Sequence, residues 1–170
     1  PAAQTTMCFM SKHAPARAEF SIPTDANVAV VAARFNAHIV DRLLAGCVER
    51  LAEHGLSDNR LTIHRVPGAF ELPVAAKMLI ETNRFAAVIC LGCVIRGETA
   101  HFEYVAGEAA RGIQAVAVQT GVPVIFGVLT TETESQAVAR SGGEHGDTGR
   151  AAADAAAEMI ALRDKIRHGG

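Results

Sequence analysis

Residues 91–105 (LGCVIRGETAHFEYV) combine the residue types that bind phosphate and transfer protons. Their spacing of one glycine, four residues and a second glycine is that of a nucleotide-binding P-loop, but Glu98 stands where the P-loop lysine contacts the outer phosphates. Because a carboxylate there would repel a triphosphate, the sequence disfavours an ATP or GTP site. A glycine, a threonine and the start of a helix still predict a cradle for one smaller phosphate group.

His101 follows this loop, and we expect it near the start of a helix that has Thr99 as its N-cap. The positive end of a helix disfavours a protonated imidazole, which leaves a neutral ring able to move protons near pH 7. His101 is therefore the candidate acid–base residue, although a histidine that is only hydrogen-bonded near the surface is the alternative interpretation. We assign that alternative to the remaining histidines, His13, His38, His54, His64, His145 and His168.

Other side chains near the predicted loops have the chemistry to bind a ring, hydroxyl groups or an anion. Arg96 and Arg140 could bind a phosphate or a carboxylate, because a guanidinium group binds such anions through paired hydrogen bonds. Phe35 and Phe126 could stack on a heteroaromatic ring or simply belong to the core. Glu71 could bind hydroxyl groups or only stabilise a helix start. These residues predict a cofactor-free site for a small ligand with a ring and a phosphate or several hydroxyl groups.

The cysteines and the remaining motifs do not indicate a metal, a catalytic triad or a dinucleotide. Cys90 and Cys93 form a C-x-x-C pair, but in a buried strand a spacing of three places their sulfurs on opposite faces of the sheet. No second pair completes a zinc site, so we expect no bound metal and reduced thiols at all four cysteines, Cys8 and Cys47 included. The sequence also has neither a G-x-S-x-G elbow nor a G-x-G-x-x-G turn after its first predicted strand.

The composition restricts the possible partners. With 170 residues, of which 49 % are hydrophobic and 20 % charged, the chain can form one domain with a substantial core. A net charge of −2 and the absence of a long basic run make nucleic acid and anionic membranes poor partners, so we expect small-molecule ligands. No apolar run approaches the ~20 residues of a membrane-spanning helix, and the N-terminus lacks a signal-peptide layout. We therefore expect a cytoplasmic protein.

The elements that must position the candidate residues alternate between strands and helices. Short apolar runs predict strands at 27–33, 60–66, 85–95 and 122–130. Apolar spacings of three and four residues, together with capping signals, predict helices at 37–54, 74–81, 101–119, 133–140 and 150–167. The strand at 122–130 is so apolar that we expect it away from the sheet edges. Residues 1–19 have no periodicity and predict a flexible N-terminal arm, which leaves 20–170 as one domain.

This alternation predicts an α/β fold, in which one doubly wound domain has a four-stranded, mainly parallel sheet covered by helices on both faces. Ligands of such sheets bind beyond the carboxyl ends of the strands. The segments RFN, VPGAFE, GCVIRGETAH and IFGVLTTE all fall at that end, and His101 is the only histidine that we expect there inside a loop with glycine and threonine. The candidate residues should therefore meet along one edge of the sheet.

Four motifs resemble those of the 6,7-dimethyl-8-ribityllumazine synthase family: RFN, VPGAFELP, GCVIRGETAHFEYV and PVIFGVLTTETESQA, in this order and spacing, over about residues 27–167. The resemblance implies a flavodoxin-like, three-layer fold and the penultimate step of riboflavin biosynthesis. In that step, 5-amino-6-ribitylaminouracil condenses with 3,4-dihydroxy-2-butanone 4-phosphate and releases phosphate and water. The family needs no metal or organic cofactor, because positioning and proton transfer supply most of the rate.

The resemblance also implies a homo-oligomer. Related proteins form pentamers, and some assemble twelve pentamers into an icosahedral shell of sixty subunits. The short turn SGGEHG permits such packing without establishing it. The N-terminal arm, around residues 20–22, would add an edge strand to the sheet of a neighbouring subunit.

By resemblance, the ring and ribityl chain of the uracil substrate would be bound by residues of the first three motifs. Phe35 would stack on the pyrimidine, and Glu71 would bind the ribityl hydroxyls. The rest of this pocket would be formed by Asn36, Ala69, Phe70, Val94 and Ile95.

The resemblance assigns the phosphate and the proton transfers to the last two motifs. Gly97, Glu98 and Thr99 would provide backbone and hydroxyl donors to the substrate phosphate. His101 would assist proton transfers during imine formation and phosphate loss. Phe126 and Arg140 would come from a neighbouring subunit, with Arg140 as the main phosphate cation.

One position departs from the family pattern and leaves alternatives open. The family usually has a Gly-Asn-Lys-Gly turn where this chain reads GDTG, with Thr148 in place of a lysine that lies near the substrate phosphate. Either Arg150 or Arg140 compensates, or the affinity for the phosphate substrate is reduced. A protein that binds a flavin or a lumazine but has weakened catalysis is therefore the alternative function, and a flavodoxin-like electron carrier is a third.

Overall fold

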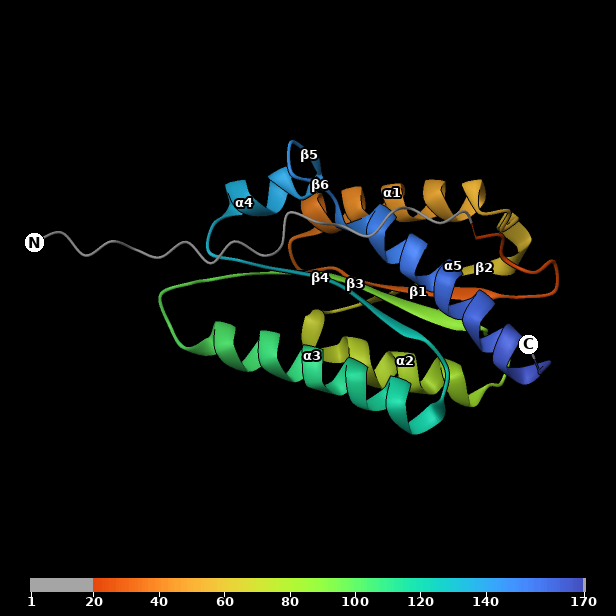
Figure 1. The fold of residues 1–170 in the computed structure, drawn as a ribbon. Coiled ribbons are helices and arrows are strands. Elements are labelled where there is room, and N and C mark those ends of the chain that lie inside the picture. Colours follow the sequence, from red (N-terminus) through yellow and green to blue (C-terminus); the bar gives the residue numbers. More distant parts are fainter. Residues whose placement is uncertain (1–19, 170) are drawn as a thin grey trace, which may run out of the picture.

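A parallel four-stranded sheet forms the middle layer of the structure, a computed structural model that describes residues 20–169 (Figure 1). Its strands are β1 (Val28–Ala33), β2 (Leu61–Val66), β3 (Ala87–Ile95) and β4 (Val124–Thr131), in the order β2-β1-β3-β4. The register pairs Val28 with both Leu61 and Ala87, and Val88 with Val124. The arm predicted at 1–19, which includes Cys8 and His13, lies outside the described residues.

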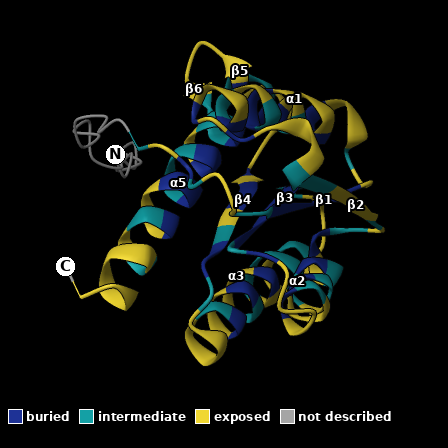
Figure 2. Cartoon of the chain, turned by 90° about the vertical axis from the view of Figure 1, so that its right-hand side faces the viewer, coloured by how far each residue is buried: buried dark blue, intermediate teal, exposed yellow. Residues whose placement is uncertain are grey.

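Helices cover both faces of the sheet (Figures 1 and 2). One face is covered by α1 (Ala37–Glu53) and α5 (Thr148–Arg167), and the other by α2 (Leu72–Glu81) and α3 (His101–Thr120). The smaller elements are the helix α4 (Glu134–Ala139), the 3-10 turns η1 (Asp58–Arg60) and η2 (Ala69–Glu71), and the antiparallel pair β5 (Ser141–Gly143) and β6 (Gly146–Asp147). The predicted doubly wound, three-layer α/β fold is confirmed.

The two central strands are buried on both faces, which explains their unbroken apolar sequences. Side chains alternate between two clusters, so that Val30 packs beneath α1 and α5 while Val31 packs beneath α2 and α3. Cys93 and Cys90 likewise lie in different clusters, as their spacing predicted. Burial raises the pKa of Cys90 to about 12 and that of Cys93 to about 11, so both are protonated thiols at neutral pH.

Two glycines allow the covering helices to approach each other closely. A Cβ atom on Gly149 of α5 would lie 1.9 Å from the carbonyl oxygen of Leu43 in α1. A Cβ atom on Gly112 of α3 would lie 2.7 Å from the ring of Pro73 in α2. Each helix pair therefore tolerates no side chain at its glycine, which accounts for a glycine inside α3 that helix propensity alone disfavours.

The prediction that the apolar fourth strand avoids the sheet edge is wrong. β4 is an edge strand, hydrogen-bonded only to β3 among the described residues. Its apolar sequence reflects the covering of its two faces, because Val128 packs in the cluster under α2 and α3 and Leu129 in the cluster under α1 and α5. Burial of a strand's faces and hydrogen bonding of its edges are separate properties, and only the first is encoded in apolar content.

The remaining helix boundaries differ slightly from those predicted. α5 begins at Thr148 because the side chain of Asp147 accepts hydrogen bonds from the backbone N–H groups of Gly149 (2.8 Å) and Arg150 (3.2 Å). α2 begins at Leu72, with Pro73 in its first turn. No helix within residues 20–169 is long and apolar enough to cross a membrane.

Candidate functional site

A pocket of about 610 Å³ opens beyond the carboxyl ends of β1, β2 and β3, where ligands of doubly wound sheets bind. We call it the carboxyl-end pocket. Its walls come from the residue after β1, from the β2–η2 segment, from the end of β3 and from the start of α3. It is lined by Phe35, Pro67, Gly68, Ala69, Phe70, Glu71, Cys93, Val94, Ile95, Gly97, Thr99, His101, Phe102, Tyr104 and Val105.

Most of the site residues named from the sequence line this one pocket. They are Phe35, Ala69, Phe70, Glu71, Val94, Ile95, Gly97, Thr99 and His101. Those that do not line it are Asn36, Glu98, Phe126 and Arg140. The pocket thus brings a ring-binding wall and the candidate acid–base residue together, without the candidate phosphate cation.

Several lining residues were missed in the sequence. Tyr104 and Val105 lie three and four residues after His101 in α3, so they share its face of the helix. That spacing was the available signal, but an aromatic and an apolar residue at helical spacing also fit an ordinary core. Tyr104 is in fact 67 % exposed, which makes it an aromatic wall of the pocket rather than a core residue.

Phe35 is an exposed aromatic residue and not part of the core, since 70 % of its surface is accessible. The backbone after β1 explains its position. The N–H groups of Arg34 and Phe35 donate to the carbonyl oxygens of Val66 and Pro67, which continues the pairing with the β2 side. A ring held at the mouth of the pocket with a free face can stack on a planar ligand.

Asn36 shapes the pocket without lining it. It adopts a left-handed conformation (φ +56°), which asparagine tolerates better than most residues. Its Nδ2 donates to the carbonyl oxygen of Cys93 at 3.0 Å, so it ties the end of β1 to the end of β3. The predicted contact of Asn36 with a ribityl chain remains a prediction, while its observed role is to hold two strand ends together.

Glu71 combines the two roles considered for it, since it stabilises a helix start and also lines the pocket. Its Oε2 accepts a hydrogen bond from the N–H of Gly68 at 2.8 Å, which closes the turn before η2. Its second carboxylate oxygen accepts no hydrogen bond from the described residues and can bind a ligand hydroxyl.

His101 is the first residue of α3, and the N-cap position belongs to Ala100 rather than to Thr99 as predicted. The hydroxyl of Thr99 still accepts a hydrogen bond from the backbone N–H of His101, at 3.4 Å. The imidazole is exposed, and within residues 20–169 it makes no hydrogen bond. Both ring nitrogens are therefore available to a ligand in the carboxyl-end pocket.

A second histidine lies near this end of the sheet, outside the loop that precedes His101. His38 lies at the start of α1, and its Nε2 is 2.8 Å from Oε1 of Glu134 at the start of α4. This pair links two helices and does not line the pocket. The difference between the two histidines is thus that His38 has a protein partner and His101 faces the pocket.

Arg96, one of the candidate cations, is held by protein groups. Its guanidinium bridges Glu103 of α3 and Glu132 after β4, each at 2.7 Å, and lies 4.3 Å above the ring of Phe102. These hydrogen bonds raise the pKa of Arg96 above its ordinary value. Arg96 therefore fixes the loop between β3 and α3 and is a poor candidate for binding a phosphate.

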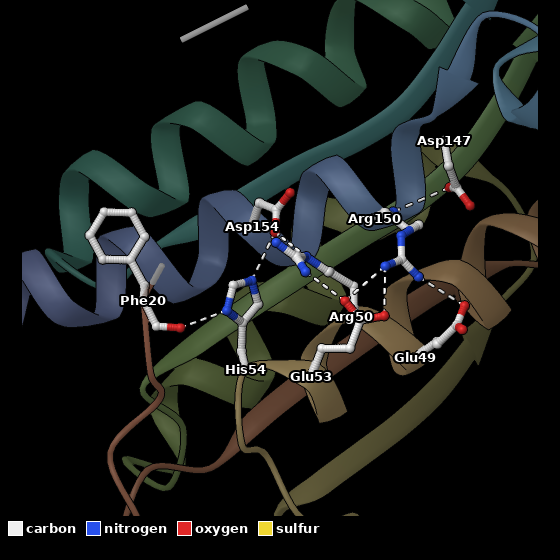
Figure 3. Close-up of polar contacts among 8 residues, drawn as sticks. All are labelled: Phe20, Glu49, Arg50, Glu53, His54, Asp147, Arg150 and Asp154. Atoms are coloured by element: carbon white, nitrogen blue, oxygen red, sulfur yellow. Dashed lines mark hydrogen bonds and ion pairs between the residues drawn. The ribbon is translucent and has the colours of Figure 1, made fainter. Parts of the chain in front are cut away.

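Arg140 and Arg150 differ in the same way. Arg150 binds Glu49 at 2.8 Å and Glu53 at 2.6 Å, both on α1 (Figure 3). Arg140 ends α4 and donates from Nη1 to the carbonyl oxygen of Gln136 at 3.0 Å, but it forms no ion pair with a carboxylate of the described residues. Of the two arginines considered as substitutes for the missing lysine, Arg140 is the one available to an anion.

The part of the chain from 20 to 169 contains no group of three histidine, cysteine or carboxylate side chains placed to hold a metal ion. The chain matches the family model described as 6,7-dimethyl-8-ribityllumazine synthase over residues 25–164. That match covers β1 to α5 and therefore every wall of the carboxyl-end pocket. The chain belongs to the 6,7-dimethyl-8-ribityllumazine synthase family.

Proposed function

We propose that this protein condenses 5-amino-6-ribitylaminouracil with 3,4-dihydroxy-2-butanone 4-phosphate to form 6,7-dimethyl-8-ribityllumazine, with release of phosphate and water. Membership of the family implies a transferase-type enzyme of riboflavin biosynthesis. The observation that carries the specific reaction is the combination, in one pocket, of an exposed aromatic face at Phe35, a carboxylate oxygen on Glu71 and the unpaired imidazole of His101.

The uracil substrate fits the apolar part of the carboxyl-end pocket. Its ring stacks on Phe35 and lies against the strand end at Val94 and Ile95. Its ribityl chain extends toward η2, where Glu71 accepts a hydrogen bond from a hydroxyl group. These contacts hold the reacting amine in place and exclude water from it, so that positioning supplies much of the rate.

The chemistry needs a group that moves protons. The 5-amino nitrogen attacks the ketone carbon, and the carbonyl oxygen leaves as water to give an imine. Loss of a proton from carbon then breaks the C–O bond to phosphate, and the enol that forms becomes a ketone. The ribityl-bearing nitrogen attacks this ketone, and loss of a second water closes the ring. These steps move protons between nitrogen, carbon and oxygen. His101 lines the pocket and has two uncommitted ring nitrogens, so it can accept and return these protons.

The phosphate requires a cation that the pocket of a single chain does not provide. None of the lining residues is an arginine or a lysine. Gly97 and Thr99 offer backbone and hydroxyl donors, but a phosphate ester bound between subunits would also need a positive charge. We assign that charge to Arg140 of an adjacent subunit, with Phe126, which is 42 % exposed on edge strand β4, closing the ring pocket from the same neighbour.

A homo-oligomer follows from this shared site, and a pentamer or a shell of pentamers satisfies it. The predicted addition of residues 20–22, as an edge strand, to the sheet of a neighbouring subunit stays a prediction. Within the described part, residues 20–22 bind their own chain. The N–H of Ile22 donates to the carbonyl oxygen of His54 at 2.9 Å, and the carbonyl oxygen of Phe20 lies 2.6 Å from Nδ1 of the same histidine.

Absorbance and fluorescence of the lumazine product test the activity. Purified protein mixed with the two substrates should form product faster than the substrates do alone. Tight binding of the product without turnover would instead establish the alternative function, a lumazine-binding protein with lost catalysis. Thr148 favours that alternative. Its backbone N–H donates to the carbonyl oxygen of Arg140 at 2.9 Å, so a lysine at position 148 would have added a second positive charge near the proposed cation.

Mixed oligomers test the shared site. His101→Ala and Arg140→Ala each inactivate one half of every site, so each pure variant should have low activity. If the proteins are unfolded, mixed in equal amounts and reassembled, about one quarter of the sites combine a native His101 with a native Arg140 from the neighbour. Activity near that level supports the shared site. A mixture no more active than the separate variants would show that both residues act within one subunit.

A further inference from the structure

A second pocket lies at the opposite end of the sheet from the carboxyl-end pocket. It has a volume of about 360 Å³ and opens at the amino ends of β1 and β3, beside the last turns of α5. We call it the amino-end pocket. It is lined by Pro23, Asp25, Ala26, Asn27, Asn83, Arg84, Phe85, Ala86, Ile160, Arg163, Asp164 and Arg167, none of which lines the carboxyl-end pocket.

Three arginines meet in this pocket without a carboxylate partner. Arg84 comes from the segment between α2 and β3, and Arg163 and Arg167 come from α5. None of them forms an ion pair with a carboxylate of residues 20–169. Elsewhere in the described chain, Arg50, Arg65, Arg96, Arg111 and Arg150 all form such pairs. The amino-end pocket therefore holds three guanidinium groups that no carboxylate of the described residues pairs with directly, against two carboxylates elsewhere in its wall.

Arg163 is held by one hydrogen bond and has a buried donor without a partner in the described part of the chain. Its Nη1 donates to the carbonyl oxygen of Ala86 at 3.0 Å, while its Nε is buried and has no hydrogen-bond partner among the described residues. Burial, and then the positive charge of Arg167, lowers the pKa of Arg163 below its ordinary value. A buried donor without an acceptor is rare in folded proteins. An anion in the pocket would stabilise the charged form of Arg163, which burial and Arg167 disfavour.

Two aspartates in the pocket wall restrict which kinds of ligand can bind there. Asp25 lines the pocket, and Asp164 also lines it while its Oδ1 lies 3.1 Å from Nδ1 of His168. Carboxylates repel a second negative group but accept hydrogen bonds from hydroxyls. The volume falls within the range of small-molecule sites and exceeds the space that one phosphate needs. A small ligand with one phosphate group and a hydroxylated substituent fits this combination.

We propose that the amino-end pocket is a second anion-binding site, which binds the phosphate group of a small phosphate ester through Arg84, Arg163 and Arg167. Guanidinium groups suit this role because they bind phosphate oxygens through paired, charge-assisted hydrogen bonds. The site is separate from the proposed reaction and does not depend on it. A protein without lumazine synthase activity would still bind phosphate here.

Equilibrium dialysis with radiolabelled inorganic phosphate tests the site in the assembled protein. Every variant carries Arg140→Gln, which weakens binding at the carboxyl-end pocket and leaves the second site to be measured. Arg163→Gln and Arg167→Gln should each weaken phosphate binding by about tenfold or more. Lys165→Gln removes a charge from the same turn of α5 but not from the pocket wall, so it should change binding by less than about twofold.

Arg167 is exposed and makes no hydrogen bond with the described residues, so its variant keeps the test valid if Arg163→Gln folds poorly. Unlabelled glycerol 3-phosphate should displace the label, and acetate at the same ionic strength should not. The proposal is overturned if the Arg140→Gln background binds no phosphate, if Arg167→Gln and Lys165→Gln bind it equally, or if acetate displaces the label as well as glycerol 3-phosphate does.

Discussion

The polar residues between α1 and α5, which Figure 3 shows, and two residues proposed to bind substrate differ in how completely they are paired. Between the helices, Arg50 binds both Glu53 and Asp154, and Arg150 binds Glu53 and Glu49. Every charged group there contacts an opposite charge. We call these residues, with His54, the α1–α5 network.

His54 is a buried member of this network, and both of its ring nitrogens have hydrogen-bond partners. It is only 6 % exposed, and its two ring nitrogens face the carbonyl oxygen of Phe20 and Oδ1 of Asp154, at 2.6 and 2.8 Å. Both oxygens are acceptors, so the arrangement is fully satisfied when both ring nitrogens carry protons. The histidine thereby connects the segment before β1 to two helices.

His101 in the carboxyl-end pocket and Arg140, which lies outside the pocket of its own chain, are of the same residue types but have no charged partner among the described residues. The ring of His101 makes no hydrogen bond, and Arg140 forms no ion pair, within residues 20–169. The comparison teaches that residue type does not separate structural groups from those proposed to bind a ligand. Pairing is the more useful criterion, because a histidine or an arginine whose donors are already used has none left for a substrate.

The largest expected effect comes from Arg140→Ala. Loss of a paired, charge-assisted contact with phosphate should lower kcat/KM for the butanone phosphate by about hundredfold while the thermal unfolding midpoint stays nearly unchanged. Arg150→Ala is the matched control, since it should lower the midpoint and leave kcat/KM per folded subunit unchanged. Equal losses of activity in the two variants would contradict the division between paired and unpaired arginines.

Asp154→Ala should have the largest effect on stability. The substitution removes the shared acceptor of Arg50 and the buried His54, and we expect the free energy of unfolding in urea to fall by about 2 kcal/mol. Glu158→Ala, at an exposed position on the same helix, should change it by less than about 0.5 kcal/mol. A similar result for both variants would mean that the α1–α5 network does not stabilise the fold.

Lowering the pH should weaken the α1–α5 network over a pH range that can be predicted. Burial alone would raise the pKa of Asp154, but hydrogen bonds from Arg50 and His54 more than offset it and hold the pKa below its ordinary value of 3.8. A carboxyl group with a lowered pKa stabilises the fold fully above its unfolded pKa, and that contribution disappears as pH falls through the folded value. Unfolding free energy measured from pH 6 to pH 2 should therefore decline more steeply in the native protein than in Asp154→Asn.

His101→Ala should have a smaller effect, a fall of about tenfold in kcat with little change in the affinity for product, because an amine and a ketone already condense once they are positioned. His38→Ala provides the control, since His38 is paired with Glu134 and lies outside the pocket. Steady-state kinetics and a product titration measure the two quantities. An unchanged kcat in His101→Ala would remove its role in proton transfer.

Thr148→Lys should have the smallest effect, and it should improve rather than weaken the use of the phosphate substrate. An added cation beside Arg140 should lower the KM for the butanone phosphate by about threefold, the size expected for an exposed ion pair. Thr148→Met, which adds length without charge, should leave this KM unchanged. If both variants behave alike, the residue at this position does not act through charge.

The fold could be predicted well because each strand and helix is encoded by residues that are close together in the sequence. Apolar runs identified each strand of the four-stranded sheet, and apolar residues spaced three and four apart identified the long helices that cover it. The position of β4 at an edge could not be predicted, because covering by α3 and α5 makes an edge strand as apolar as a central one. The helix boundary at Thr148 was missed because it depends on one side-chain cap, that of Asp147.

For the site, the sequence indicated which residues lie together where a motif is continuous, and gave no signal where a property depends on distant partners. Residues of the motifs after β1, β2 and β3 do meet in one pocket. That Arg150 is held by Glu49 and Glu53, or that Asn36 binds Cys93, follows only from the packing of segments far apart in the chain. The amino-end pocket is the extreme case, since Arg84 and Arg163 become neighbours only in the folded sheet.

The strand order has a consequence for how the chain folds. No two neighbouring strands of the sheet are joined by a hairpin, and β1 pairs with both β2 and β3. Each pairing must therefore close a long loop before its contacts form, which slows folding. During synthesis, β1, β2 and α1 leave the ribosome well before β3 and α5. One face of the growing sheet is thus covered only by α1 until α5 arrives, and the close approach of Gly149 to Leu43 then joins the two helices over that face.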